Sequence, residues 1–125
     1  AEAEATRAIG VATGTATVRV VANAMLAHVL FMRGETAAAL IPSRVAMRIL
    51  REVGGIEEGE SFVRLVHAET LHAQSDRSGA RKAITEARDR LMDRAKKIDE
   101  PKWRKSFLER VPENARTIVL ATEWT

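Results

Sequence analysis

The amino-acid sequence predicts an all-α fold built from antiparallel helix pairs. Aromatic residues make up only 4% of the 125 residues, proline occurs three times, and apolar residues recur at helical spacing. A core with so few aromatic side chains must be built mainly from Ala, Leu, Val, Ile and Met, and this composition, with many Arg and Glu, favours helices over sheets. A repeated order of residue types indicates that the helices come in pairs.

The segment 64–91 reads as two helices joined by a short polar turn, and an earlier segment repeats it. Small and large apolar residues give each helix a seam that faces the other, at Ala68, Leu71, Ala80, Ile84 and Ala87. Residues 75–79, SDRSG, interrupt the periodicity, and two helices joined by so short a turn lie antiparallel. The same order of residue types occurs 41 positions earlier, at Ala27, Leu30, Gly34, Ala39 and Ala46.

The first half of the chain is predicted to form helices over residues 1–11, 16–33 and 35–53, with GVATGT connecting the first two. Gly34 is expected to end the second helix, since glycine tolerates the left-handed conformation that closes a helix. Pro42 lies inside the third. Because proline lacks an N–H and clashes with the preceding turn, we expect this helix to be kinked near Ala38 or to begin later.

The second half is predicted to contain a helix pair at 58–74 and 77–98, followed by a cap at 101–124. Asp76 is a suitable N-cap for the second helix of the pair. Pro112 is expected to start the last helix of the cap, because proline is well tolerated at a first helical position. The preceding short helix, which is expected to fold over the 77–98 helix, carries the apolar residues Trp103, Phe107 and Leu108.

Over residues 24–91 the two pairs resemble tetratricopeptide repeats, in which a small residue, a large one three positions later, a turn glycine and two later alanines mark each pair. The period of 41 residues exceeds the usual length of about 34. Asn23 and Arg64 stand where an aromatic residue is common, Ser43 replaces a large apolar residue, and no proline closes either repeat.

The tail from Trp103 to Trp124 resembles a segment that closes helical-repeat arrays in large multidomain bacterial signalling proteins, which often carry a kinase or ATPase module. Together the resemblances imply one tetratricopeptide-like domain over residues 1–125. Its repeats would lie at 16–53 and 58–98 and its cap at 101–124. We expect this domain to be a fragment of a longer chain.

Such a domain is expected to be a scaffold of a bacterial signalling or regulatory protein that binds a peptide or helix on a concave surface. The candidate partner-binding residues are polar positions on the first helix of each pair: Asn23, His28, Arg64, His67 and His72. The competing hypothesis is a ligand-sensing or oligomerisation segment that regulates an attached kinase or ATPase. We also expect a homodimer through the N-terminal helices, because Ile9, Val11 and the Val18, Val20 and Val21 cluster would otherwise lack an apolar neighbour.

The sequence predicts no catalytic residue, metal site or cofactor, and we expect no enzymatic activity. His67 and His72 are separated by about 140° around a helix, whereas zinc ligands at i,i+4 share a face. GVATGT lacks the lysine of a phosphate-binding loop. The serines have no nucleophile-elbow context, although the sequence leaves a Ser–His–acid triad open. The acidic run Glu57, Glu58 and Glu60 fits a helix start better than a cation site.

Charge and composition set the expected partners and location. The net charge is +3, but acids alternate with the bases of residues 77–97 and few aromatics are present to stack on bases, so nucleic acid is the least favoured partner. The absence of cysteine fits a reducing cytoplasm. The apolar segment 18–32 is interrupted by Arg19, Asn23 and His28 and is expected to be too short to span a membrane.

Overall fold

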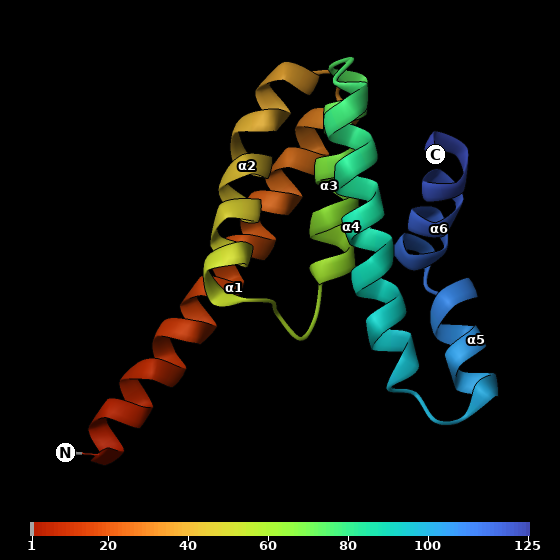
Figure 1. Ribbon diagram of the computed structural model, residues 1–125. Helices are drawn as coiled ribbons and strands as arrows, with labels where there is room; N and C mark the ends of the chain where they lie inside the picture. Colours follow the sequence, from red (N-terminus) through yellow and green to blue (C-terminus); the bar gives the residue numbers. More distant parts are fainter. Residues whose placement is uncertain (1) are drawn as a thin grey trace.

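The computed structural model describes the backbone of residues 2–125 and the side chains of residues 14–125 (Figure 1). This part of the chain consists of helices joined by turns and loops and contains no strand, which confirms the predicted all-α class. The six helices are α1 (Glu2–Met32), α2 (Thr36–Val53), α3 (Glu60–Ala73), α4 (Arg77–Lys96), α5 (Pro101–Glu109) and α6 (Pro112–Trp124).

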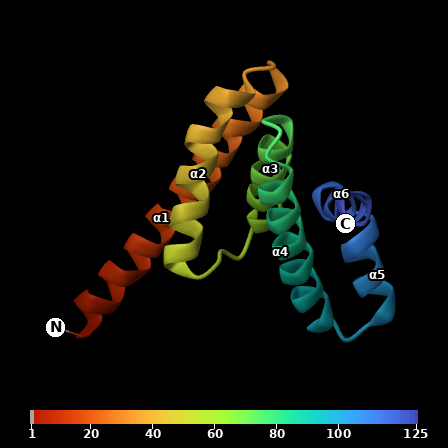
Figure 2. The same cartoon turned by 45° about the horizontal axis from the view of Figure 1, so that its top comes forward.

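The helices form two antiparallel pairs and a C-terminal extension (Figures 1 and 2). Helix α1 packs along α2, and α3 packs along α4. Helix α3 also contacts both α2 and α1, so it joins the two pairs, while α6 packs against α3 and α4. The N-terminal part of α1 projects beyond the end of α2 (Figure 1).

Helix α1 corrects the expectation of two N-terminal helices separated by GVATGT, because it is continuous from Glu2 to Met32. Gly10 and Gly14 lie within it. A glycine inside a helix costs about 1 kcal/mol relative to alanine, which is too little to break a long helix whose C-terminal part packs along α2. Residues 1–11 are therefore not a separate half repeat. The side chains of Ile9 and Val11 lie outside the described residues.

Local signals correctly placed the end of α1 and the start of α4, whereas α3 (60–73) and the C-terminal end of α4 (96) are shorter than the predicted 58–74 and 77–98. Gly34 adopts φ +80°, and its N–H donates to the Phe31 carbonyl at the close of α1. Pro42 lies buried within α2, which begins at Thr36, one residue later than the repeat implied. The Oδ1 atom of Asp76 accepts the N–H of Gly79 at 2.9 Å, as expected of the N-cap of α4. These contacts close two interhelical turns at defined residues.

Two apolar clusters form the core. The first joins α1, α2, α3 and the loop before α3, through Val20, Ala24, Ala46, Met47, Ile49, Leu50, Ile56 and Val63. The second joins α3, α4 and α6, through Leu65, Ala68, Ile84, Leu120 and Ala121. The seam alanines that are 41 positions apart, Ala27 with Ala68 and Ala39 with Ala80, are all completely buried.

Trp103 does not cover α4, although it was expected to do so. Its side chain is 62% exposed, and the Nζ atom of Lys102 lies 5.8 Å from the ring centroid. Leu120 and Ala121 of α6 are buried instead. Helix α5 is held by Arg104, whose guanidinium donates twice to the Ile98 carbonyl, at 3.0 and 2.7 Å. This polar contact ties the start of α5 to the loop that follows α4.

Candidate functional site

A groove of about 500 Å³ lies where α2 of the first pair meets α3 of the second. We call it the α2/α3 groove, and its lining consists of Arg44, Met47, Arg48, Arg51, Glu52, His67 and Leu71. The three arginines occupy positions i, i+4 and i+7 of α2, a spacing that places side chains on one helix face. We call them the arginine row. All three are exposed, whereas Met47 and Leu71 are buried.

The arginine row is not neutralised within the described part of the molecule. The ion pairs found among the described side chains do not include Arg44, Arg48 or Arg51. Glu52 is the single acidic residue in the lining, so three cations face one carboxylate. The groove therefore combines an excess of positive charge with apolar side chains at its base.

His67 lies at the base of this groove and is held there by Ser43. The Nδ1 atom of His67 is 3.0 Å from Ser43 Oγ, and both residues are buried. Burial and the nearby positive charges of Arg51, Arg44 and Arg64 lower the pKa of His67 to about 4. The imidazole is therefore neutral at pH 7. The Ser43 hydroxyl therefore provides a hydrogen-bond partner for a buried ring nitrogen of His67.

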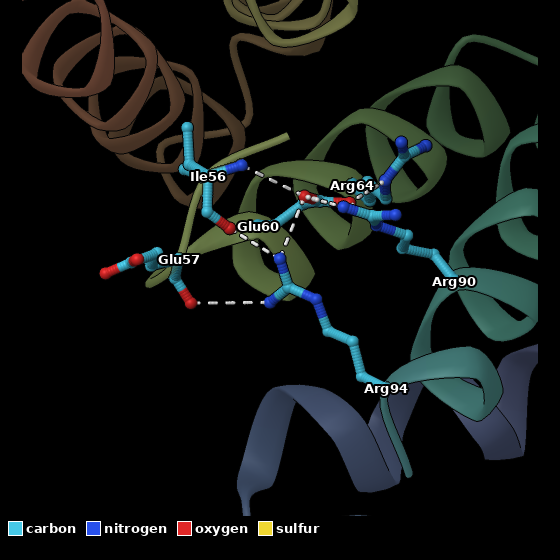
Figure 3. A network of polar contacts seen from close by, with 6 residues as sticks. All are labelled: Ile56, Glu57, Glu60, Arg64, Arg90 and Arg94. Atoms are coloured by element: carbon cyan, nitrogen blue, oxygen red, sulfur yellow. Dashed lines mark hydrogen bonds and ion pairs between the residues drawn. The ribbon is translucent and has the colours of Figure 1, made fainter. Parts of the chain in front are cut away.

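A second polar cluster surrounds Glu60 at the start of α3 (Figure 3). The Glu60 carboxylate is 1% exposed and accepts from Arg64 Nε at 3.0 Å, Arg90 Nε at 2.8 Å and Arg94 Nη2 at 3.1 Å. It also accepts the N–H of Ile56 at 3.2 Å. Burial alone would raise the pKa of Glu60, but the hydrogen bonds from Arg64, Arg90 and the Ile56 N–H together with the positive charge of Arg64 lower it below its usual value.

This Glu60 network, comprising Glu60, its three arginines and Ile56, ties α3, α4 and the preceding loop together. Arg94 also donates to the Ile56 and Glu57 carbonyls of that loop. Gly55 adopts φ +133°, and a Cβ atom there would meet Arg90 Nη2 at 2.5 Å. The hollow beside Glu60 leaves no room for a water-sized molecule. The network is thus a filled structural cluster, and the α2/α3 groove is the better candidate for binding.

The structure does not gather the five predicted partner-binding residues on one surface. His67 lines the groove, and Arg64 belongs to the Glu60 network. His72 stacks on Trp124 with centroids 4.3 Å apart, and His28 meets Phe62 edge-on at 5.5 Å. Asn23 Nδ2 donates to its own helix, to the Arg19 carbonyl at 2.8 Å.

Sequence reasoning missed the residues that dominate both clusters. The arginine row is visible in the sequence as i, i+4 and i+7 spacing, but basic residues are more numerous over 77–97. Arg90 lies four residues after Glu86 on α4, a spacing at which the two side chains can pair, yet it reaches Glu60 of another helix. No group of three or more His, Cys, Asp or Glu side chains among those described is arranged to hold a metal ion.

Comparisons with protein-family models, with curated proteins and with solved structures give no match. Function must therefore be inferred from the groove and its neighbouring surfaces. The resemblance to tetratricopeptide repeats is likewise based only on the pattern of residues in this sequence.

The segment Gly14–Met32 of α1, which is longer than the 18–32 segment considered from the sequence, is long and apolar enough to cross a membrane by length and composition alone. The core helix of a soluble protein and a signal sequence meet the same criterion, and it assigns no location. One face of the segment is occupied, since Val20, Ala24 and Ala27 are buried. The opposite face carries exposed apolar side chains, which bear on function below.

Proposed function

We propose that the chain is a tetratricopeptide-like scaffold that binds a peptide or helix of another protein, in a cytoplasmic bacterial signalling or regulatory assembly. The observation that carries this proposal is the α2/α3 groove, which lies where two antiparallel helix pairs meet. Stacked helix pairs create extended surfaces of this kind, and such surfaces bind protein segments. The burial of equivalent seam alanines in both pairs supports the repeat interpretation.

The chemistry of the groove supports binding over catalysis. Ser43 and His67 are the one Ser–His contact in the groove, but a hydrolytic triad places a carboxylate behind the imidazole to stabilise its protonated form. Here the charges that act on the imidazole are Arg51, Arg44 and Arg64, which oppose protonation and, together with burial, lower its pKa to about 4. An imidazole with that pKa is a weak general base near pH 7. The pair is better suited to fixing the base of the groove.

An unrestricted peptide-display selection against the complete 125-residue chain tests the proposal. We expect enrichment of peptides that compete with one another for a single site and bind more weakly to an Arg48→Ala variant. Arg77→Ala provides the matched control, because Arg77 is an exposed arginine of α4 outside the groove. Failure to enrich any peptide, or equal binding to both variants and the wild type, would show that the groove is not the binding site.

A second candidate function, oligomerisation of a larger regulatory protein, is favoured by the free face of α1. The positions 18, 22, 25, 29 and 32 alternate in steps of four and three residues, as the a and d positions of a coiled coil do. We call these residues the α1 stripe: Val18, Ala22, Met25, Val29 and Met32. All five are exposed, and apolar stripes of this spacing bury themselves against a second helix.

Oligomerisation through the α1 stripe predicts a concentration-dependent sedimentation coefficient. Met25→Glu should shift the wild-type chain toward monomer, because the substitution places a charge at the centre of the apolar contact. Val119→Glu is the control, since Val119 is an exposed apolar residue of α6. A wild-type chain that stays monomeric at high concentration would eliminate this second function.

A further inference from the structure

We propose that the partner of the α2/α3 groove is an acidic helical segment of another protein, with carboxylates placed opposite Arg44, Arg48 and Arg51. This inference rests on the proposed scaffold function and specifies its ligand. It follows from the charge of the groove, the spacing of its arginines and the apolar side chains between them.

The charge argument comes from the contrast between two sets of three arginines. Arg64, Arg90 and Arg94 all reach the single carboxylate of Glu60, and the network they form is buried or partly buried. The arginine row has no such carboxylate among the described side chains, and its guanidinium groups stay exposed beside a groove. A partner that supplies carboxylates would form ion pairs with these three arginines, as Glu60 does with Arg64, Arg90 and Arg94. Arginine pairs readily with carboxylates in two-point hydrogen bonds.

The spacing argument favours a helix. Arg44 and Arg51 are separated by seven residues of α2, or about 10.5 Å along the helix axis. A partner helix with acidic residues at i, i+4 and i+7 repeats this separation, so each carboxylate meets one guanidinium. Met47 and Leu71 are 3% and 7% exposed at the base of the same groove, and this small apolar surface can contact a leucine or methionine on the facing side of that helix.

The lining favours protein over nucleic acid. Glu52 stands in the wall of the groove, where it would repel a continuous phosphate backbone but can be avoided by discrete carboxylates. The groove has no Phe, Trp or Tyr among its lining residues to stack on bases. Helix α4 offers no continuous alternative, because Arg90 and Arg94 turn toward Glu60.

Three synthetic helical peptides test the inference against the complete chain. They share one leucine and differ at positions i, i+4 and i+7, which carry Glu, Gln or Lys. We expect the Glu peptide to bind at least roughly tenfold more tightly than the Gln peptide at low salt, and the Lys peptide to bind least. Added salt should reduce the difference in affinity between the Glu and Gln peptides, since salt screens exposed ion pairs.

Charge reversal in the protein makes the test specific to the groove. The variant Arg48→Glu should bind the Glu peptide more weakly than the wild type, and the triple variant Arg44→Glu/Arg48→Glu/Arg51→Glu should bind it more weakly still. The triple variant should bind the Lys peptide more tightly than the wild type does. Arg77→Glu controls for net charge. Because the substituted arginines are exposed, the single variant should retain the wild-type helical circular dichroism signal. If the triple variant fails to fold, the affinity of the single variant for the Glu peptide tests the inference.

Each contrary outcome has a distinct meaning. Equal affinity for the Glu and Gln peptides would overturn the inference that the partner is acidic. The proposed scaffold function would still stand if the unrestricted selection yields groove-binding peptides. A selection that yields none would overturn the scaffold itself. Tighter binding of a random DNA duplex than of the Glu peptide, lost in Arg48→Glu, would replace the protein partner by nucleic acid.

Discussion

Replacing Glu60 by alanine should lower the free energy of unfolding by about 3 kcal/mol. Removing one partner of a buried ion pair typically costs about 3–5 kcal/mol, because the remaining charge is left uncompensated. The lower end applies here, since the side chains of Arg64, Arg90 and Arg94 are 17%, 41% and 27% exposed and can gain some water. The Ile56 N–H also loses its acceptor. Urea unfolding followed by circular dichroism measures the effect.

Two further variants identify the cause of that loss. Glu57→Ala removes an exposed carboxylate three residues away and should change stability by less than about 0.5 kcal/mol. Glu60→Gln keeps the size of the side chain and its ability to accept, so it should fall between alanine and the wild type. If Glu60→Ala were as stable as Glu57→Ala, the Glu60 network would not contribute measurably to the stability of the fold.

The free energy of unfolding should decrease by about 3 kcal/mol as the pH falls from about 6.5 to about 4, because of His67. The unfolded imidazole has a pKa near 6.5, whereas burial and neighbouring arginines lower the folded pKa to about 4. Between these values the unfolded chain binds more protons than the folded chain, so acid favours unfolding. The difference of about 2.5 pKa units corresponds to roughly 3 kcal/mol, fully lost below the folded value.

Urea unfolding at a series of pH values measures this dependence. His67→Gln should flatten the curve between pH 6.5 and 4, whereas His72→Gln should retain the wild-type fall because His67 is still present. Glu60 acts at lower pH: its folded pKa is lowered, so its contribution is present above its unfolded pKa and disappears as the pH falls through the folded one. An unchanged slope in His67→Gln would mean that the imidazole is not buried as a neutral group.

The helix pairs could be predicted from sequence wherever a local signal marks an end. Gly34 and Asp76 each adopt the role that their residue type favours, at the close of α1 and the start of α4. The failure at GVATGT has the opposite origin. Two glycines in a short stretch resemble a connection, but their small intrinsic penalty does not interrupt a helix that packing elsewhere supports.

The two polar clusters could not be predicted from the sequence without knowledge of the fold. Glu60 lies 30 positions from Arg90 and 34 from Arg94, so no local spacing links them. Glu60 and Arg90 each also have an opposite charge four positions away on their own helix, Arg64 and Glu86. The arginine row is visible in the sequence as a spacing. Its meaning depends on α3 lying beside α2, which places Leu71 and His67 at its base.

The most direct test of the scaffold is a backbone amide chemical-shift map of the chain titrated with the tightest peptide from the unrestricted selection. We expect the largest chemical-shift changes at residues 44–52 of α2 and around His67 and Leu71 of α3, with α5 unaffected. Changes centred on the α1 stripe or on α5, with residues 44–52 unmoved, would contradict it.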